Sequence, residues 1–164
     1  MESPAILPKP SAQRRPSARG RALMLLAFVA LYGIACWLPA LHLTGRRQVW
    51  SGMEVMVMGP MALRLGQFGW LANPAAIIAL RSVMSGRTRL AIPCSVLAAL
   101  LALHTPWLIG HQITLGPEPF NFVRVVSLGA GYYVWLAALL LPLAFALLLR
   151  RQRPGRRRLE AGSK

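Results

Sequence analysis

Four long apolar stretches, separated by short polar segments, constrain this 164-residue chain more than any other feature. Each stretch approaches the roughly 20 apolar residues that a helix needs to cross a bilayer. Membrane-spanning helices are therefore expected at about residues 22–43, 55–80, 90–110 and 125–149. Because the sequence leaves no room for a second folded domain, it predicts an all-α fold, namely an integral-membrane four-helix bundle.

The second of these spans is the least regular. Its uninterrupted apolar part, residues 65–80, would give a helix of only about 24 Å, which is short for a hydrocarbon core of about 30 Å. The helix is therefore expected to begin near residue 55, with the Arg64 side chain reaching toward a lipid headgroup.

The distribution of charge predicts the orientation of the chain. The formal net charge is +15, from 19 Lys+Arg and 4 Asp+Glu. If both termini are cytoplasmic, 15 of the basic residues lie inside and only Arg46, Arg47, Arg64 and Arg124 lie outside. This agrees with the excess of Lys and Arg in cytoplasmic segments of membrane proteins. The arginine-rich composition is typical of a bacterial genome rich in GC, so a multi-pass protein of a bacterial inner membrane is predicted.

The two ends of the chain, residues 1–21 and 150–164, are rich in Pro, Ser, Gly and Arg and show no apolar periodicity. They are expected to be disordered, basic and cytoplasmic. Their arginines would contact anionic lipid headgroups. No nucleic-acid partner is predicted, because no aromatic residues alternate with the basic ones to stack on bases.

Small residues at helical spacing predict how two of the spans pack. Gly69, Ala72, Ala76 and Ala79 share one face of the second span, and a similar face of the third span carries Ala91, Ser95, Ala98, Ala102 and Thr105. Helices in a bilayer associate through close contact at such residues. These two faces are therefore expected to pack against each other.

Polar residues within a span are the best indicators of function in such a chain. Asn73 lies near the middle of the predicted second span, directly before Pro74, which is expected to bend the helix. The pair is either part of a polar site or the source of an interhelical hydrogen bond. His104 is a further candidate as a haem or metal ligand, but no acidic partner accompanies it, and no cofactor is predicted.

A cluster of methionines follows the first span. Met53, Met56, Met58 and Met61 hold four of the seven methionines of the chain. Thioethers bind Cu(I), so copper handling is one hypothesis. The alternative is adaptable apolar packing, because these positions do not share one face of a helix.

The sequence gives little support to an enzymatic function. No acidic residue lies deep in a span, and the chain has no serine elbow, phosphate-binding loop or zinc-protease motif. Cys36 and Cys94 both fall in apolar stretches and do not form a CxxC pair. A non-enzymatic protein is therefore predicted.

Three local patterns resemble the uncharacterised small bacterial four-helix inner-membrane proteins. They are Trp50-Ser51-Gly52-Met53-Glu54, Gly69-Trp70-Leu71-Ala72-Asn73-Pro74 and Gly131-Tyr132-Tyr133-Val134-Trp135-Leu136. The resemblance covers about residues 22–149 and implies the four-span topology but no activity or ligand. It directs attention to Trp70, Asn73, Pro74, Tyr132, Tyr133 and Trp135.

Taken together, the sequence predicts a membrane protein that acts through helix–helix contacts, as a subunit, an assembly factor or a regulator. A protein partner in the membrane or a second copy of the chain is expected. The alternatives are a small transport or copper-handling protein and, third, a membrane enzyme.

Overall fold

The computed structural model describes residues 17–44, 49–63, 66–114 and 122–151. Most of the predicted basic tails, residues 1–21 and 150–164, lies outside these ranges. The exceptions are residues 17–21 and 150–151, which cap or belong to helices. The predicted disorder of the tails therefore remains a prediction.

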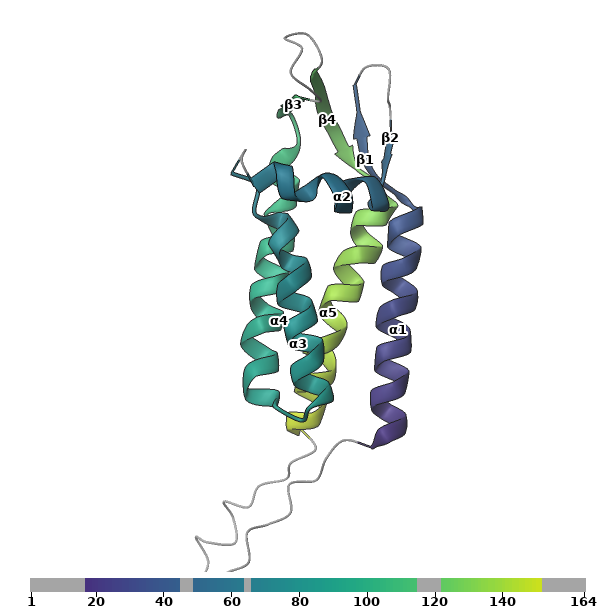
Figure 1. Cartoon of the computed structure of the whole chain (residues 1–164), viewed down its shortest axis with the longest axis vertical. Helices are drawn as coiled ribbons and strands as arrows, with labels where there is room; N and C mark the ends of the chain where they lie inside the picture. Colours follow the sequence, from purple (N-terminus) through teal and green to yellow (C-terminus); the bar gives the residue numbers. More distant parts are fainter. Residues whose placement is uncertain (1–16, 45–48, 64–65, 115–121, 152–164) are drawn as a thin grey trace, which may run out of the picture.

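Four helices run lengthwise beside one another (Figure 1): α1 (Ala18–Trp37), α3 (Ala72–Met84), α4 (Thr88–Leu103) and α5 (Ala130–Arg151). Helix α5 contacts the other three, and α3 packs along α4. Within the described part of the chain, three helical segments are long and apolar enough to cross a membrane: Ala18–Trp37, Thr88–Leu108 and Ala130–Arg151. The segment Thr88–Leu108 joins α4 to a short 3-10 helix, η3 (Thr105–Leu108).

The segment predicted as a second span, residues 55–80, is not one helix. It is divided into α2 (Gly52–Ala62), which lies across the ends of the long helices (Figure 1), and the 3-10 helix η2 (Gly69–Leu71), which leads into α3. The start of α2 is fixed by a capping box, in which Ser51 Oγ accepts from Glu54 N at 3.3 Å and the Glu54 carboxylate accepts from Ser51 N at 2.9 Å. Gly66, with a φ of +74°, lies between α2 and η2 in a conformation that favours glycine.

A small antiparallel sheet corrects the all-α prediction, because the chain is mostly helical but not purely so. Its strands are β1 (Pro39–Leu43), β2 (Val49–Ser51), β3 (Gln112–Thr114) and β4 (Phe122–Leu128), in the order β2-β1-β4-β3. Strands β1 and β4 pair in the register Leu41↔Leu128. The prediction failed because β1 directly follows α1 and β4 directly precedes α5, so each strand extended an apolar run long enough to be a helix.

The sheet has an apolar core of its own. Leu41, Leu43, Trp50, Val123 and Val125 are buried together, and Val55 of α2 and Leu108 of η3 pack against them. The sheet is thereby attached to α2 and η3 at one end of the long helices (Figure 1). We call this the sheet end of the molecule.

The opposite end carries the arginines. The start of α1, the turn between α3 and α4 and the end of α5 meet there (Figure 1), and their basic residues are Arg19, Arg21, Arg81, Arg87, Arg89, Arg150 and Arg151. Arg21 Nη1 donates a hydrogen bond of 3.0 Å to the carbonyl oxygen of Met84 and so joins α1 to the end of α3. We call this the arginine end.

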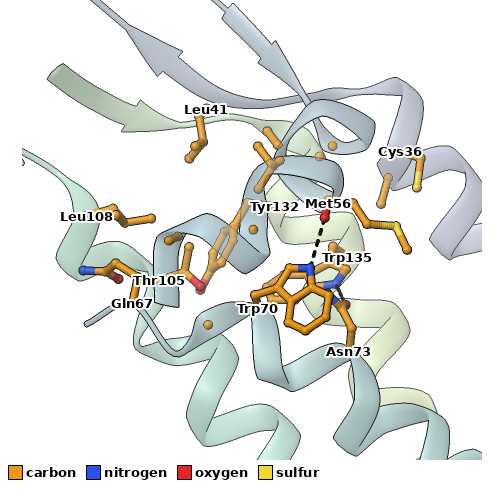
Figure 2. Close-up of a pocket in the computed structure, with 18 of the residues that line it drawn as sticks. Cys36, Leu41, Met56, Gln67, Trp70, Asn73, Thr105, Leu108, Tyr132 and Trp135 are labelled. Atoms are coloured by element: carbon orange, nitrogen blue, oxygen red, sulfur yellow. Dashed lines mark hydrogen bonds between the residues drawn. The ribbon is translucent and has the colours of Figure 1, made fainter. Parts of the chain in front are cut away.

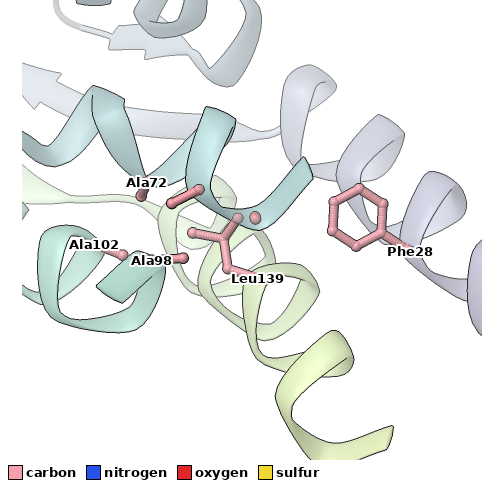
Figure 3. Packing of buried hydrophobic residues seen from close by; sticks show 7 residues of the cluster. Phe28, Ala72, Ala98, Ala102 and Leu139 are labelled. Atoms are coloured by element: carbon pink, nitrogen blue, oxygen red, sulfur yellow. The ribbon is translucent and has the colours of Figure 1, made fainter. Parts of the chain in front are cut away.

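The predicted packing of the two small-residue faces is confirmed. Helices α3 and α4 lie against each other, and the alanines of both faces are at most 1% exposed. Leu139 of α5 and Phe28 of α1 complete this cluster (Figure 3). The small side chains let the helix backbones approach closely, as expected for helices that associate without water.

Candidate functional site

A cavity of about 100 Å³ lies at the sheet end, directly under α2. In Figure 2, Asn73, Trp135 and Cys36 lie toward one end of the pocket, Gln67, Thr105 and Leu108 toward the other, and Tyr132 between them. Its walls come from α1, β1, α2, η2, α3, η3 and α5, and most of the lining is apolar. We call this cavity the α2 pocket.

Asn73 joins three helices at one end of the α2 pocket. Its Oδ1 atom accepts a hydrogen bond of 2.9 Å from the Tyr32 hydroxyl of α1 and one of 2.8 Å from Trp135 Nε1 of α5. The side chain itself belongs to the first turn of α3. The predicted interhelical hydrogen bonding of Asn73 is therefore present, and the residue also lines a mostly apolar pocket, while its membership of a polar site stays a prediction.

Trp70 holds α2 over the pocket. Its Nε1 atom donates a hydrogen bond of 3.0 Å to the carbonyl oxygen of Met56 (Figure 2). The indole ring lies so close to Gly59 of α2 that a Cβ atom there would collide with it. Glycine at this position is therefore what permits the close approach of the helix to the ring.

Tyr132 and Tyr133 have different surroundings although they are adjacent. Tyr132 is buried and lines the pocket, and its hydroxyl donates a hydrogen bond of 3.1 Å to the carbonyl oxygen of Ala102. Four residues after Ala102 stands Pro106, which has no N–H to offer that carbonyl, so Tyr132 supplies a donor in its place. Tyr133 is 61% exposed, outside the pocket, with its ring centroid 5.2 Å from that of Tyr132.

Two predicted residues have roles different from those expected. Pro74 does not bend the middle of a span, because α3 begins at Ala72 and Pro74 lies in its first turn, where a helix tolerates proline. His104 ends α4 and does not line the pocket. Its ring instead contacts Trp107, with the two ring centroids 5.4 Å apart.

All four methionines of the predicted cluster lie on helix α2. Met56 lines the α2 pocket, and the Tyr32 hydroxyl is 3.7 Å from its Sδ atom. Met53, Met58 and Met61 are exposed and are not among the residues that line this pocket. Because positions 53, 56, 58 and 61 do not share one face of α2, their spacing does not favour a shared copper site, and copper binding remains a hypothesis.

Three pocket residues were missed by the sequence analysis or given another role. Tyr32 was not considered, although a tyrosine far from the ends of an apolar segment is itself a polar signal. Gln67, which is only 4% exposed, was not among the predicted site residues, and Thr105 was assigned to helix packing. Gln67 belongs to the site because of the break after α2, which no local pattern indicated, whereas the approach of Thr105 to Gly69 agrees with the predicted packing of the two small-residue faces.

Comparison with protein-family models, with curated proteins and with solved structures finds no match for this chain. Its function has to be argued from the residues of the α2 pocket and from the placement of that pocket in the fold.

Proposed function

We propose that the chain is a non-enzymatic integral protein of a bacterial inner membrane that binds a small apolar molecule in the α2 pocket. In this way it acts as a binding subunit or regulator of a larger membrane process. The observation that carries the proposal is the pocket itself, a mostly apolar cavity at one end of the long helices. Cavities with apolar walls and a few placed polar groups are the usual form of small-molecule sites.

The walls of the α2 pocket are held in place by hydrogen bonds. Asn73 connects α1, α3 and α5, and the Trp70 indole attaches α2 to the segment that precedes α3. A cavity whose walls are fixed in this way stays open without a ligand, so binding needs little reordering of the protein.

The chemical character of the lining favours binding over catalysis. The polar side chains of the pocket are amides, hydroxyls, indoles and the Cys36 thiol. Such groups orient a ligand by hydrogen bonding, whereas acid–base catalysis typically uses His, Asp, Glu, Lys or an activated Tyr or Cys.

The arginine end supports an orientation with both termini in the cytoplasm, where basic residues gather. The sheet end and the α2 pocket would then lie toward the periplasm. We expect a phosphatase reporter that requires export to be inactive when fused after Lys164 and active when inserted between β1 and β2. The reverse pattern would contradict this orientation.

Binding in the α2 pocket is tested with 4-fluorotoluene, a small apolar compound that fluorine NMR detects directly. The full chain in detergent micelles is expected to bind it saturably. Ala62→Phe, which places a ring in the pocket from α2, should abolish saturable binding. Val57→Phe adds the same ring to the same helix at a position that is 64% exposed and outside the pocket, so it should leave binding intact.

Two results would contradict the proposed function. One is the absence of saturable binding to the unmodified chain. The other is equal loss of binding in both variants, with both retaining the helical content of the unmodified chain by circular dichroism.

A further inference from the structure

Two buried oxygen atoms of the α2 pocket lack a hydrogen-bond partner. They are Gln67 Oε1 and Thr105 Oγ1, and neither has a partner within the described part of the chain. The side chains are 4% and 9% exposed. An unpaired polar atom in such a place lowers stability, so folded proteins leave few of them.

Both residues line the same pocket. In Figure 2, Gln67 and Thr105 are labelled toward the side of the pocket opposite Asn73 and Trp135. Thr105 Oγ1 is also directly next to Gly69, where a Cβ atom would approach it to 2.5 Å. The absence of a side chain at Gly69 therefore leaves the threonine hydroxyl beside η2 and near the cavity.

The side-chain carbonyl oxygen at the other end of the pocket is already paired. Asn73 Oδ1 already accepts two hydrogen bonds, from Tyr32 and from Trp135, and a carbonyl oxygen has two lone pairs. A polar group of a ligand therefore finds an unused acceptor at the Gln67 end and not at the Asn73 end.

The two free atoms define what a ligand must offer. Gln67 Oε1 only accepts hydrogen bonds, whereas the Thr105 hydroxyl both donates and accepts. A ligand hydroxyl group matches this pair, because its O–H donates to Gln67 Oε1 while its oxygen accepts from Thr105. A hydrocarbon leaves both atoms unpaired, and a charged group would be costly in an apolar cavity.

The rest of the cavity indicates the shape of the ligand. Its volume of about 100 Å³ is of the order of the roughly 150 Å³ engineered cavity that binds benzene in another protein. The indoles of Trp70 and Trp135 and the phenol ring of Tyr132 form much of the wall (Figure 2). Aromatic walls favour an aromatic ligand through offset or edge-to-face ring contacts.

We propose that the ligand of the α2 pocket is a phenol, a single hydroxylated ring whose O–H group pairs with Gln67 and Thr105. This inference rests on the proposed function, because it names the chemical class bound in the same pocket. The ring enters either as a free molecule from the aqueous side or as the head of a lipid-like molecule from the bilayer.

The test compares 4-fluorophenol with 4-fluorotoluene, which differ by a hydroxyl in place of a methyl group. The ratio of their Kd values is measured by fluorine NMR on the full chain in one detergent. We expect the ratio to favour the phenol, and to fall about tenfold in Gln67→Met and in Thr105→Val, because one hydrogen bond of about 1.4 kcal/mol corresponds to a factor of ten. Both variants keep nearly the same side-chain volume.

Gln112→Met serves as the matched control. Gln112 lies on β3, is exposed and does not line the pocket, so its replacement should leave the ratio unchanged. Competition by 4-dodecylphenol in nanodiscs distinguishes the two sources of the ring. If 4-dodecylphenol competes more strongly than phenol itself, the ring belongs to a lipid-like molecule of the bilayer. If it competes more weakly, the ring belongs to a soluble molecule.

The outcomes distinguish a failure of the phenol inference from a failure of the proposed function. If 4-fluorotoluene binds saturably but Gln67→Met and Thr105→Val leave the ratio unchanged, water satisfies the two oxygens and the phenol inference is wrong while the pocket remains a binding site. If neither compound binds saturably, the proposed function itself is wrong.

Discussion

The small-residue contact between α3 and α4 and the α2 pocket follow opposite rules of packing. In the contact, alanines fill the space completely and are at most 1% exposed. In the pocket, large aromatic side chains and a helix that crosses over them leave a cavity of about 100 Å³. The two regions adjoin, because Ala72 is followed directly by Asn73.

This difference indicates that the contact between α3 and α4 is the rigid part of the molecule, whereas the sheet end contains space for a ligand. Small side chains allow close packing of helix backbones along much of the length of α3 and α4. At the sheet end, hydrogen bonds of Asn73 and Trp70 join the helices around the cavity instead. A tightly packed base below an open pocket suits a site that stays formed without its ligand.

The largest change in the free energy of unfolding is expected in the contact between α3 and α4. Ala98 is 0% exposed in the cluster of α3, α4 and α5, so Ala98→Leu forces a larger side chain into filled space. We expect a loss of about 1–3 kcal/mol in the free energy of unfolding, measured by SDS titration of the detergent-solubilised chain. The neighbouring change Ala99→Leu, at a half-buried position on the same helix, is the control. Equal stability of the two variants would contradict the predicted contact.

A smaller loss is expected where hydrogen bonds form the wall of the pocket. Asn73→Leu removes the acceptor shared by Tyr32 and Trp135, and we expect it to cost about 1–2 kcal/mol. The measurement is a double-mutant cycle with Tyr32→Phe. Tyr32→Phe should lower stability in the unmodified chain and have almost no effect in the Asn73→Leu background. Additive losses would mean that the bond does not contribute.

The smallest effect on the free energy of unfolding is expected at Thr105, and here the substitution should stabilise rather than destabilise the protein. Thr105→Val replaces an unsatisfied buried hydroxyl by a methyl group of similar size, so stability should stay the same or rise by up to about 1 kcal/mol. The same unfolding assay measures it. A loss comparable to that of Asn73→Leu would show that Thr105 Oγ1 has a partner in the folded protein.

Long-range helix packing was predictable from the sequence because its signal is local. The spacing of Ala72, Ala76 and Ala79 on one segment and of Ala91, Ala98 and Ala102 on another predicts two faces, and a short connection makes the helices neighbours. The strands were not predictable in the same way. Short alternating runs such as 39–43 merge with an adjacent apolar helix, and the pairing of β1 with β4 joins residues about 85 positions apart.

The candidate site was predictable only in part. Asn73, Trp70, Tyr132 and Trp135 stand out as polar or aromatic residues in apolar segments, and all four line the α2 pocket. Gln67 did not stand out, because its importance depends on the turn at Gly66 that folds α2 over the helices, and Thr105 stood out only as a helix-packing residue. A residue whose role arises from tertiary placement leaves no pattern in its own segment.

The central claim, that the α2 pocket admits a small molecule, is tested most directly through Cys36. Both cysteines of the chain are free, and Cys36 lines the pocket whereas Cys94 does not. In Cys94→Ser, the labelling rate of Cys36 by N-ethylmaleimide should fall roughly tenfold with 4-fluorotoluene at about ten times its Kd, since only the empty tenth of the molecules then reacts. In Cys36→Ser, the labelling of Cys94 should not change. Equal labelling of Cys36 with and without the ligand would contradict the claim.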